Sequence, residues 1–349
     1  MRHFFVTGGA GFIGSAFVRL LLDESPACRV TNFDALTYAG NPDNLAGLDP
    51  ARHRFVRGDI CDREAVLAAL EDDTEYIFNF AAESHVDRSI HSADEFLRTN
   101  VLGTQVLLDA ARARRARRFV QVSTDEVMGS LPEDDSAYFT EDSPFEPNSP
   151  YSASKAAAEH LVRAAHHTHG LDAVVTRCGN NYGPRQFPEK FLPLMLSNAM
   201  ADEPIPVYGD GQNVRDWIYV EDHCRAILLA AERGRAGAVY NVGARNERRN
   251  LEVAESVLDA LGKPRTLLRF VKDRPGHDRR YAIDPSLAER ELGWRPRETW
   301  ESGLKKTIEW YAANGEWLAR ARGGAYREFY ERQYGDGLES GAESRESTR

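Results

Sequence analysis

Short apolar runs alternate with amphipathic stretches along the first half of the chain. The amphipathic stretches carry apolar residues at helical spacing and cover residues 12–24, 63–72, 93–113 and 151–168. The apolar runs between them are HFFVTG, RVTNFD, RFVRGD, YIFNFAAE, RFVQVST and AVVTRC. Strands that alternate with helices indicate right-handed crossovers and a parallel sheet covered on both faces. The pattern therefore predicts a doubly wound α/β domain over residues 1–177.

The pattern changes after about residue 178. Prolines and glycines interrupt residues 179–193, 203–213 and 273–280, with helical stretches between them. This favours a smaller C-terminal lobe of loops and a few helices over residues 178–334, rather than further regular strand–helix–strand units. We expect some of its segments to return to the first domain. Residues 335–349 are polar and poor in apolar residues, which predicts a disordered tail.

A glycine-rich turn follows the first predicted strand and opens the first predicted helix. It reads GGAGFIG, and its Gly8, Gly11 and Gly14 allow a tight turn and close approach of a pyrophosphate to the helix N-terminus. We expect Phe12 and Ile13 of the same turn to line that site. The alternative is a tight turn between strand and helix that binds no ligand. The position between strand and helix favours a dinucleotide site in a Rossmann-type sheet.

Acidic residues at the ends of the next two strands refine the cofactor prediction. Asp34 ends the second strand, where a carboxylate can take ribose hydroxyls and would repel a 2′-phosphate, so NAD is favoured over NADP. Asp59 and Ile60 follow the third strand and suit the adenine edge. Ala81 and Ala82 follow the fourth strand, at the carboxyl edge where ligands bind in such sheets.

The fifth strand and the helix after it carry groups suited to redox chemistry. The strand brings Ser123 and Thr124 to the same edge, and YSASK places Tyr151 and Lys155 four residues apart on one helix face. A lysine ammonium near a phenol favours the phenolate, and the positive charge of a nicotinamide would act in the same direction, so we expect a lowered pKa for Tyr151. The sequence thus predicts a tyrosine base that removes a hydroxyl proton while hydride leaves the same carbon.

Composition and charge restrict the partners. The 349 residues carry a formal net charge of −10, which argues against nucleic acid, although residues 112–118 read RARRARR. We interpret that cluster as the solvated end of a helix. The four cysteines form no CxxC pair, and no apolar run is long enough to span a membrane. We expect a cytoplasmic protein with reduced thiols.

Eight motifs together resemble the extended short-chain dehydrogenase/reductases and, among these, the dTDP-glucose 4,6-dehydratases. They are TGGAGFIG, AAESHVDRS, TDEV, YSASK, NNYGP, FPEK, VRDW and DRPGHDRRY. The resemblance covers residues 2 to about 315. It implies oxidation at C4 of a nucleotide sugar, loss of water across C5–C6, and return of the hydride to C6, so that NAD is regenerated. It also adds Thr99 to the cofactor residues.

The resemblance implies a role for each polar residue after the fifth strand. Thr124 positions the C4 oxygen, Asp125 is the acid that protonates the leaving hydroxyl, and Glu126 is the base that removes the C5 proton. Lys155 tunes Tyr151 and holds the nicotinamide ribose. Two neighbouring carboxyls in a partly dry site separate their pKa values, which would keep one of them protonated. The alternative for Asp125 and Glu126 is a solvated turn.

The resemblance also implies a nucleotide-sugar site in the second lobe. Its diphosphate needs arginine and lysine charge, and its base needs an aromatic or apolar wall. The alternative for Arg215 is a surface ion pair with Asp216, and for His277 a structural histidine. The expected contacts are Ser84, Thr124, Asn181, Lys190, Phe191, Pro206, Val207, Tyr208, Arg215, Asn250, Arg274 and His277.

Four points complete the predictions. His85 and Asp87 have metal-ligand spacing but lack a third ligand nearby, so we expect a polar loop and no metal. Met128 stands where the resembled family usually has tyrosine, and we favour a packing role over a changed substrate contact. The helices over 96–111 and 151–165 carry small residues and could form a homodimer interface. The sequence leaves open whether the base of the substrate is thymine or uracil. The alternative activity is that of a nucleotide-sugar epimerase or decarboxylase of the same superfamily.

Overall fold

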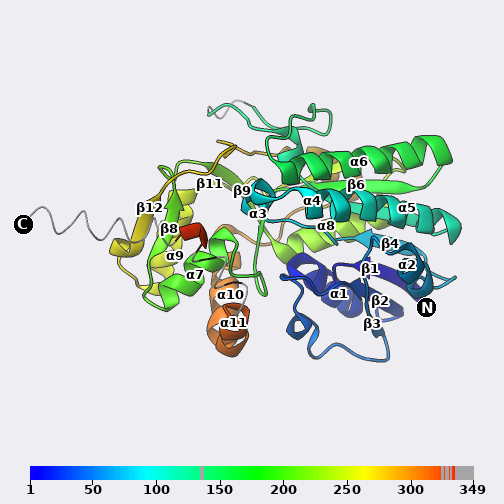
Figure 1. Cartoon of the computed structure of the whole chain (residues 1–349), viewed down its shortest axis with the longest axis horizontal. Helices are drawn as coiled ribbons and strands as arrows, with labels where there is room; N and C mark the ends of the chain where they lie inside the picture. Colours follow the sequence, from blue (N-terminus) through cyan, green and yellow to red (C-terminus); the bar gives the residue numbers. More distant parts are fainter. Residues whose placement is uncertain (134–136, 324–325, 327–329, 331, 335–349) are drawn as a thin grey trace, which may run out of the picture.

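Seven parallel strands form the central sheet, in the order β10-β6-β5-β4-β1-β2-β3 (Figure 1). Phe4 of β1 pairs with Val30 of β2 on one side and with Tyr76 of β4 on the other. All three side chains are buried, as expected where helices cover both faces. The predicted doubly wound α/β fold is confirmed. The strands are β1 (Arg2–Thr7), β2 (Cys28–Asp34), β3 (His53–Arg57), β4 (Tyr76–Asn79), β5 (Arg118–Thr124), β6 (Ala173–Cys178) and β10 (Val239–Val242).

The structure is a computed structural model that describes residues 1–133, 137–323, 326, 330 and 332–334. The predicted tail, residues 335–349, lies outside the described residues.

Two layers of helices cover the sheet. On one face α1 (Phe12–Glu24) packs against α8 (Val220–Arg233), and Phe17 and Ile227 belong to the core between them and the strands. The other face carries α2 (Arg63–Ala69), α5 (Thr104–Ala113) and α6 (Pro150–His169). Shorter helical segments are η1 (Pro42–Leu45), α3 (Val86–His91), α4 (Asp94–Phe96), the π-helical η2 (Leu97–Gly103) and η3 (Asp125–Met128).

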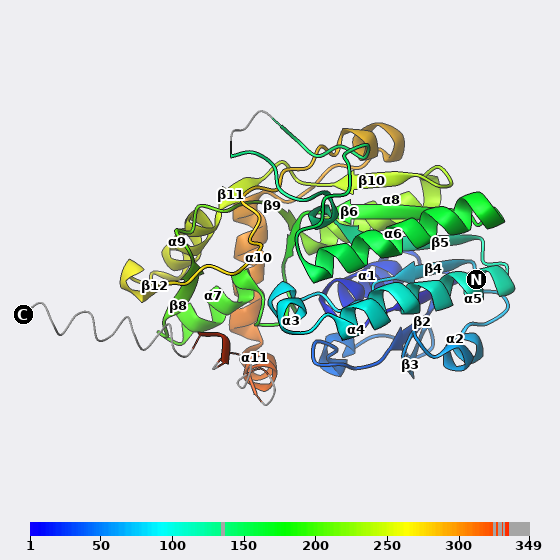
Figure 2. The ribbon, with the colours of Figure 1, turned by 45° about the horizontal axis from the view of Figure 1, so that its top comes forward.

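The second lobe packs beside the carboxyl ends of these strands (Figure 2). Its core contains the aromatic side chains of Tyr182, Trp217, Trp300 and Trp317. Its strands form two small sheets, β11-β9-β7 and β12-β8. The strands are β7 (Asn180–Tyr182), β8 (Ile205–Tyr208), β9 (Val214–Tyr219), β11 (Glu247–Arg249) and β12 (Leu268–Val271). The helices are α7 (Phe191–Met200), α9 (Asn250–Leu261), η4 (Arg265–Leu267), η5 (Ala288–Leu292), α10 (Trp300–Ala313) and α11 (Gly315–Ala321).

The chain returns to the first sheet after it has entered the second lobe. Strand β10 pairs with β6 in parallel, and α8 covers the sheet beside α1. These are segments of residues 178–334 that belong to the first domain. The sequence led us to expect such a return but did not indicate which segments would make it, because the proline- and glycine-rich stretches on either side belong to the second lobe.

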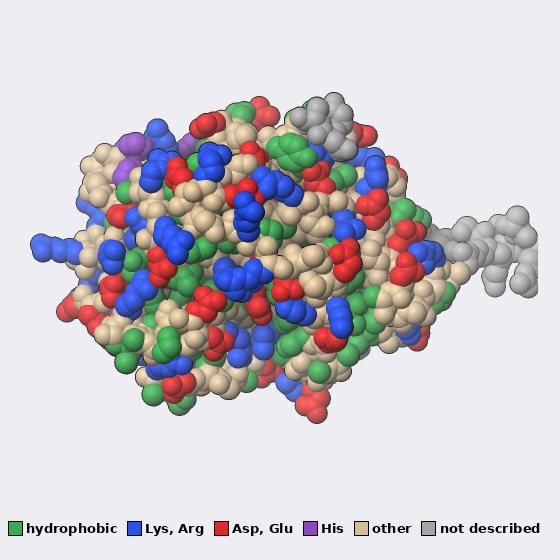
Figure 3. All heavy atoms as spheres, turned by 180° about the vertical axis from the view of Figure 1, so that it is seen from behind, with side chains coloured by type: hydrophobic (Ala, Val, Ile, Leu, Met, Phe, Trp, Pro, Cys, Tyr) green, Lys and Arg blue, Asp and Glu red, His purple; other side chains and the backbone are tan. Residues whose placement is uncertain are grey.

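Basic and acidic side chains are interspersed on the surface, as the rear face shows (Figure 3). The cluster at residues 112–118 follows this rule, because Arg114 contacts Asp72 and Arg118 lies 2.8 Å from Asp172. Helix α5 ends at Ala113, so most of the cluster lies in the following turn rather than in the helix. In the part of the chain that the structure describes, every helix is too short or too polar to cross a membrane.

Candidate active site

The glycine-rich turn lies between β1 and α1 and leaves no room for side chains. Gly8 has a φ of +68°, and a Cβ there would lie 2.6 Å from the backbone nitrogen of Ala81. A Cβ on Gly14 would lie 2.2 Å from the carbonyl oxygen of Gly8. Helix α1 begins at Phe12 without a side-chain cap on its first amides. The turn thus offers backbone N–H groups and a helix N-terminus to a bound anion.

Asp34 ties this turn to the loop after β2. Its carboxylate accepts hydrogen bonds from the amides of Ala10, at 2.9 Å, and Leu36, at 2.7 Å. Burial raises the pKa of Asp34, and the two amides oppose that shift. Asp59, which follows β3, accepts from Arg98 at 2.7 Å. Both carboxylates line the cavity described below.

Strand β5 ends in a polar cluster that Thr124 organises. Its Oγ1 accepts from the amide of Glu126 at 3.3 Å, which caps η3, and donates to Asp125 Oδ1 at 3.2 Å. Oδ2 of Asp125 is buried with no hydrogen-bond partner among the described residues. The alternative of a solvated turn is wrong for Asp125, since that side chain is buried.

Burial raises the pKa of both acids. For Asp125 the pKa lies well above its ordinary value, first through burial and then through the negative charge of Glu126. The pKa of Glu126 is also raised by burial, but Arg274, Lys190 and Arg215 counteract this. The two neighbours therefore differ in the positive charge that faces them. Asp125 is the better proton donor of the two, and Glu126 is the more readily ionised.

Helix α6 brings Tyr151 and Lys155 to the same cluster. The helix starts with a capping box in which Ser149 and Ser152 exchange hydrogen bonds, so that Tyr151 sits in the first turn. Lys155 Nζ donates to the carbonyl of Val122 at 2.6 Å, and burial lowers the pKa of Lys155 to about 8.

The expected lowering of the pKa of Tyr151 is wrong for this structure. Burial raises the pKa of Tyr151 well above its ordinary value, and the negative charge of Glu126 adds to the increase. The prediction counted the positive charges of Lys155 and of a bound nicotinamide, whereas in the protein itself two carboxyl groups and a dry environment surround the phenol. A neighbouring positive charge beyond those of the protein is needed to reverse the direction.

Arg215 reaches the cavity from β9. It is 4% exposed, donates to the carbonyl oxygens of Val214 (2.7 Å) and Asp278 (2.8 Å), and lies 4.1 Å from the ring centroid of Tyr281. The alternative of a surface ion pair with Asp216 is wrong. Asp216 instead accepts from the backbone amide of Asn246 at 2.8 Å.

The other side chains of the second lobe are held by polar contacts to both lobes. Arg274 lies 3.2 Å from Asp87, which also accepts from the hydroxyl of Tyr208 at 3.1 Å. Lys190 Nζ donates to the carbonyl of Ser84 at 2.6 Å. His277 contacts Asp273 at 2.6 Å, and burial lowers its pKa to about 4.

One continuous cavity at the carboxyl edge of the sheet brings almost all the predicted residues together. The exception is Val207, which belongs to the core of the second lobe. The predicted residues that line the cavity are Gly8, Gly11, Phe12, Ile13, Gly14, Asp34, Asp59, Ile60, Ala81, Ala82, Ser84, Thr99, Thr124, Asp125, Glu126, Tyr151, Lys155, Asn181, Lys190, Phe191, Pro206, Tyr208, Arg215, Asn250, Arg274 and His277.

The cavity also contains residues that the sequence did not single out as site residues. Glu83 and Glu189 are immediate neighbours of predicted residues within AAES and PEK. Their position in these motifs is the signal from which they could have been predicted. Tyr281 stacks on Arg215, and Tyr334 lies 3.3 Å from the hydroxyl of Tyr208. Nothing in the sequence indicates these two contacts, because they join distant parts of the chain.

Met128 lies outside the cavity lining and packs against Val127, Phe139 and Ile283. Its sulfur is 3.5 Å from a guanidinium nitrogen of Arg177. These contacts agree with a packing role.

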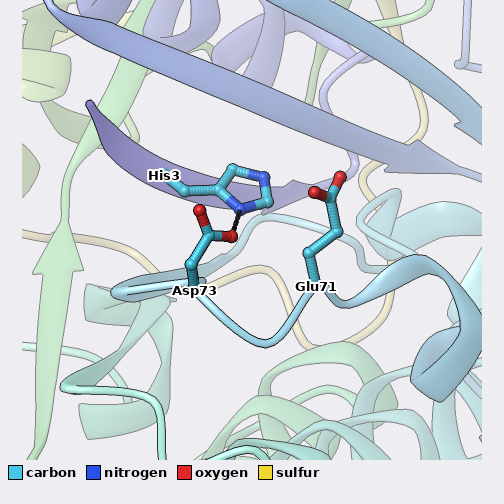
Figure 4. A group of neighbouring side chains, drawn as sticks. All are labelled: His3, Glu71 and Asp73. Atoms are coloured by element: carbon cyan, nitrogen blue, oxygen red, sulfur yellow. Dashed lines mark hydrogen bonds and ion pairs between the residues drawn. The ribbon is translucent and has the colours of Figure 1, made fainter.

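Among the described residues, one group of a histidine and two carboxylates has donor atoms close enough to hold a metal ion, namely His3, Glu71 and Asp73 (Figure 4). It lies outside the cavity, and Arg29 contacts both carboxylates at 2.7 Å. His3 already bonds Thr31 at 2.9 Å. The group is an ion-pair cluster whose charges compensate one another.

Comparison with known proteins agrees with this geometry. Residues 5–307 match the family described as GDP-mannose 4,6 dehydratase. A dTDP-glucose 4,6-dehydratase of Xanthomonas campestris is 51% identical over 94% of this chain and 98% of its own. One from Streptomyces niveus is 53% identical over 89% of this chain and 93% of its own.

The chain belongs to the dTDP-glucose 4,6-dehydratase family.

Solved structures place the chain in the same family. The dTDP-glucose 4,6-dehydratase DesIV from Streptomyces venezuelae, with NAD and TYD bound, is 50% identical, covers 91% of this chain and 99% of its own, and has a TM-score of 0.88. A Thermus thermophilus UDP-glucose 4-epimerase in complex with NAD is 31% identical over 89% of this chain and 99% of its own, with a TM-score of 0.83. The dTDP-glucose 4,6-dehydratase family and this epimerase therefore share one fold.

Proposed function

We propose that this protein converts dTDP-glucose to dTDP-4-keto-6-deoxy-glucose with NAD that stays bound between turnovers. The observation that carries the proposal is the row Thr124, Asp125 and Glu126, which shares one cavity with Tyr151 and a dinucleotide turn; Thr124 and Asp125 are buried and Glu126 is half-buried. An epimerase oxidises and reduces a single carbon and has no use for an additional acid and base. The names of the relatives support the same reaction.

The residues that would hold NAD fit a dinucleotide. The cradle that a Cβ at Gly8 or Gly14 would fill suits the pyrophosphate, and Asp34 suits the ribose hydroxyls. When bound, NAD would accept hydride from C4, return it to C6, and bring a positive charge that favours ionised Tyr151. The remaining assigned residues are Gly11, Phe12, Ile13, Asp59, Ile60, Ala81, Ala82, Thr99, Tyr151 and Lys155.

In the oxidation, Thr124 and Tyr151 hold the C4 hydroxyl of the sugar. Tyr151 removes its proton, and the charge of Lys155, four residues along α6, favours the phenolate. Burial raises the pKa of Tyr151, so the phenol stays protonated until bound NAD would add its positive charge. Proton removal would therefore occur only in a site that holds NAD.

In the elimination, Glu126 takes the C5 proton and Asp125 protonates the leaving C6 hydroxyl. The raised pKa of Asp125 supports the role of acid, because burial and the negative charge of Glu126 both favour the protonated carboxyl group. Glu126 is assigned the base because Arg274, Lys190 and Arg215 favour its ionised form.

The second lobe supplies the nucleotide site in this proposal. Arg215 is buried and Arg274 partly buried, and both are suited to a diphosphate, to which guanidinium donates two hydrogen bonds. The remaining assigned contacts are Ser84, Thr124, Asn181, Lys190, Phe191, Pro206, Tyr208, Asn250 and His277. Residues 1–177, with α8 and β10, would bind the cofactor, and the rest of 178–334 would bind the nucleotide sugar.

We also propose a cytoplasmic homodimer. All four cysteines are free, which suits a reducing compartment. Leu97 and Leu102, on η2 beside α6, are 51% and 61% exposed, which is unusual for leucines so close together.

Mass spectrometry tests the reaction directly. The purified protein is incubated with dTDP-glucose and with UDP-glucose separately, without added NAD. Loss of one water from the dTDP sugar supports the reaction, the base and the retained cofactor together. Loss from the UDP sugar alone would retain the mechanism and change the substrate. No mass change even with added NAD would contradict the dehydratase proposal.

A further inference from the structure

Three segments that are far apart in the chain meet around the carboxylate of Glu189. The first is the loop after β2, which carries Tyr38, and the second is α3, which carries Arg88. The third is the segment before α7 that carries Glu189 itself. Arg88 Nε lies 3.1 Å from Glu189 Oε2, and its guanidinium lies 4.0 Å from the ring centroid of Tyr38. The phenol of Tyr38 also lies close enough to Glu189 for the carboxylate charge to raise its pKa, after burial as the larger cause. We call these three residues the interlobe cluster.

Further contacts join the same segments. The backbone carbonyl of Glu189 lies 3.4 Å from Nε2 of His85, next to α3. The ring of Phe187 meets that of Tyr38 edge to face, with centroids 6.0 Å apart. Lys190 donates to the carbonyl of Ser84. In Figures 1 and 2, α3 lies between the central sheet and the lobe that contains α7.

Burial makes the interlobe cluster costly to open. The Glu189 side chain is 1% exposed and that of Arg88 27% exposed. Removing one partner of such a pair leaves a charge without compensation in a dry environment, which costs far more than breaking a surface pair. The pKa of Tyr38 is raised well above its ordinary value by burial, with Glu189 and Glu83 adding to it. The phenol therefore stays protonated at neutral pH, with its hydroxyl group directed into a buried and acidic environment.

The interlobe cluster borders the part of the cavity that is assigned to the cofactor. Thr37 and Gly40, on either side of Tyr38, line the cavity, and the loop they belong to begins at Asp34. Glu189 lines it from the opposite lobe. For a dinucleotide to leave between β2 and the second lobe, this loop has to move away from Glu189 and Arg88.

We infer that the interlobe cluster of Tyr38, Arg88 and Glu189 closes the cavity over the cofactor and slows its release. These are positioning residues, since they act through the loop after β2 and not on the reacting atoms. The inference rests on the proposed function, in which NAD is regenerated within each turnover. It gives a structural reason why regenerated NAD would stay bound, because the contact that joins the lobes would also cover the cofactor.

The test compares cofactor retention in two variants and a matched control. Glu189→Gln keeps the shape and removes the charge, and Tyr38→Phe removes only the hydroxyl. Asp222→Asn is the control, because Asp222 is a buried carboxylate paired with Arg225 at 2.6 Å that does not line the cavity. NAD per subunit is measured after gel filtration, and its release rate by competition with excess labelled NAD.

We expect NAD release to be roughly 10- to 100-fold faster in Glu189→Gln and less strongly accelerated in Tyr38→Phe. Release in Asp222→Asn should equal that of the wild type, and added NAD should restore kcat in both variants. Wild-type retention in folded Tyr38→Phe and Glu189→Gln would overturn the inference, as would equal loss in the control. A wild-type protein that holds NAD but dehydrates no sugar would contradict the proposed function alone.

Discussion

Burial and the distribution of positive charge set the protonation of the two neighbouring acids after β5. Asp125 has a free buried oxygen and a strongly raised pKa, whereas three cations face Glu126. One backbone position thus separates a proton donor from a proton acceptor. The difference depends on which arginines and lysines of the second lobe reach each carboxyl.

Glu126→Gln tests the role of base at this scale. An amide of the same shape cannot take the C5 proton, so kcat should fall by about 10²- to 10⁴-fold with little change in KM. Initial rates of water loss measure both constants. Glu146→Gln, at an exposed position, is the control and should retain wild-type kcat. A Glu126→Gln variant with wild-type kcat would remove Glu126 from the mechanism.

The lowered pKa of Lys155 predicts that activity falls at alkaline pH. Its pKa is lowered to about 8 by burial, so raising the pH through that value removes the positive charge that favours ionised Tyr151. Below that pH the charge is present, and this group imposes no loss. We expect kcat/KM to fall above about pH 8 in a pH–rate profile. Lys155→Arg stays charged and should shift the limit upward; an unchanged limit would assign it to another group, such as Lys190.

At the scale of single elements, the start of α6 fixes the phenol. Ser149 caps the helix and accepts from the amide of Ser152, and Tyr151 lies between them. Fraying of this first turn would move Tyr151 relative to Thr124 on β5. The cap therefore links the stability of a helix end to the geometry of the site.

Ser149→Ala should lower both stability and turnover. Loss of the cap costs about 1 kcal/mol of unfolding free energy, and the freed first turn should lower kcat severalfold. Thermal unfolding and initial rates measure the two effects. Thr299→Ala removes the equivalent capping box of α10, far from Tyr151 in the chain, and should lower stability without lowering kcat. Equal effects on kcat would mean that Ser149 acts through stability alone.

The sequence predicted most elements and the motif residues because each of these depends on neighbours in the chain. β5, α1 and β6 coincide with or closely match the predicted runs. The sequence did not indicate that β10 is the strand that returns to the first sheet, because its pairing with β6 joins segments far apart in the chain. The prediction for the pKa of Tyr151 failed for a related reason, because that pKa depends on burial and on charged groups from distant parts of the chain. The interlobe cluster was invisible because Tyr38, Arg88 and Glu189 share no motif.

At the scale of the whole molecule, exposed leucines predict the association of two copies. Leu102→Glu places a charge in the proposed interface on η2, and we expect it to convert a dimer to a monomer. Light scattering after gel filtration measures the mass. Phe270→Glu is the control, because Phe270 is 56% exposed on β12 in the other lobe and should leave the mass unchanged. A monomeric wild-type protein would contradict the dimer.

The return of the chain from the second lobe to β10 restricts how the protein can be recombined. No single cut yields two pieces that each contain a complete sheet, because β6 and β10 are neighbours in space but enclose α7, β8 and β9 in sequence. A chimera that exchanges only residues after 178 with a relative would also replace an edge strand of the cofactor sheet. An engineer who wants another sugar specificity must therefore graft two separate segments, one on each side of α8 and β10.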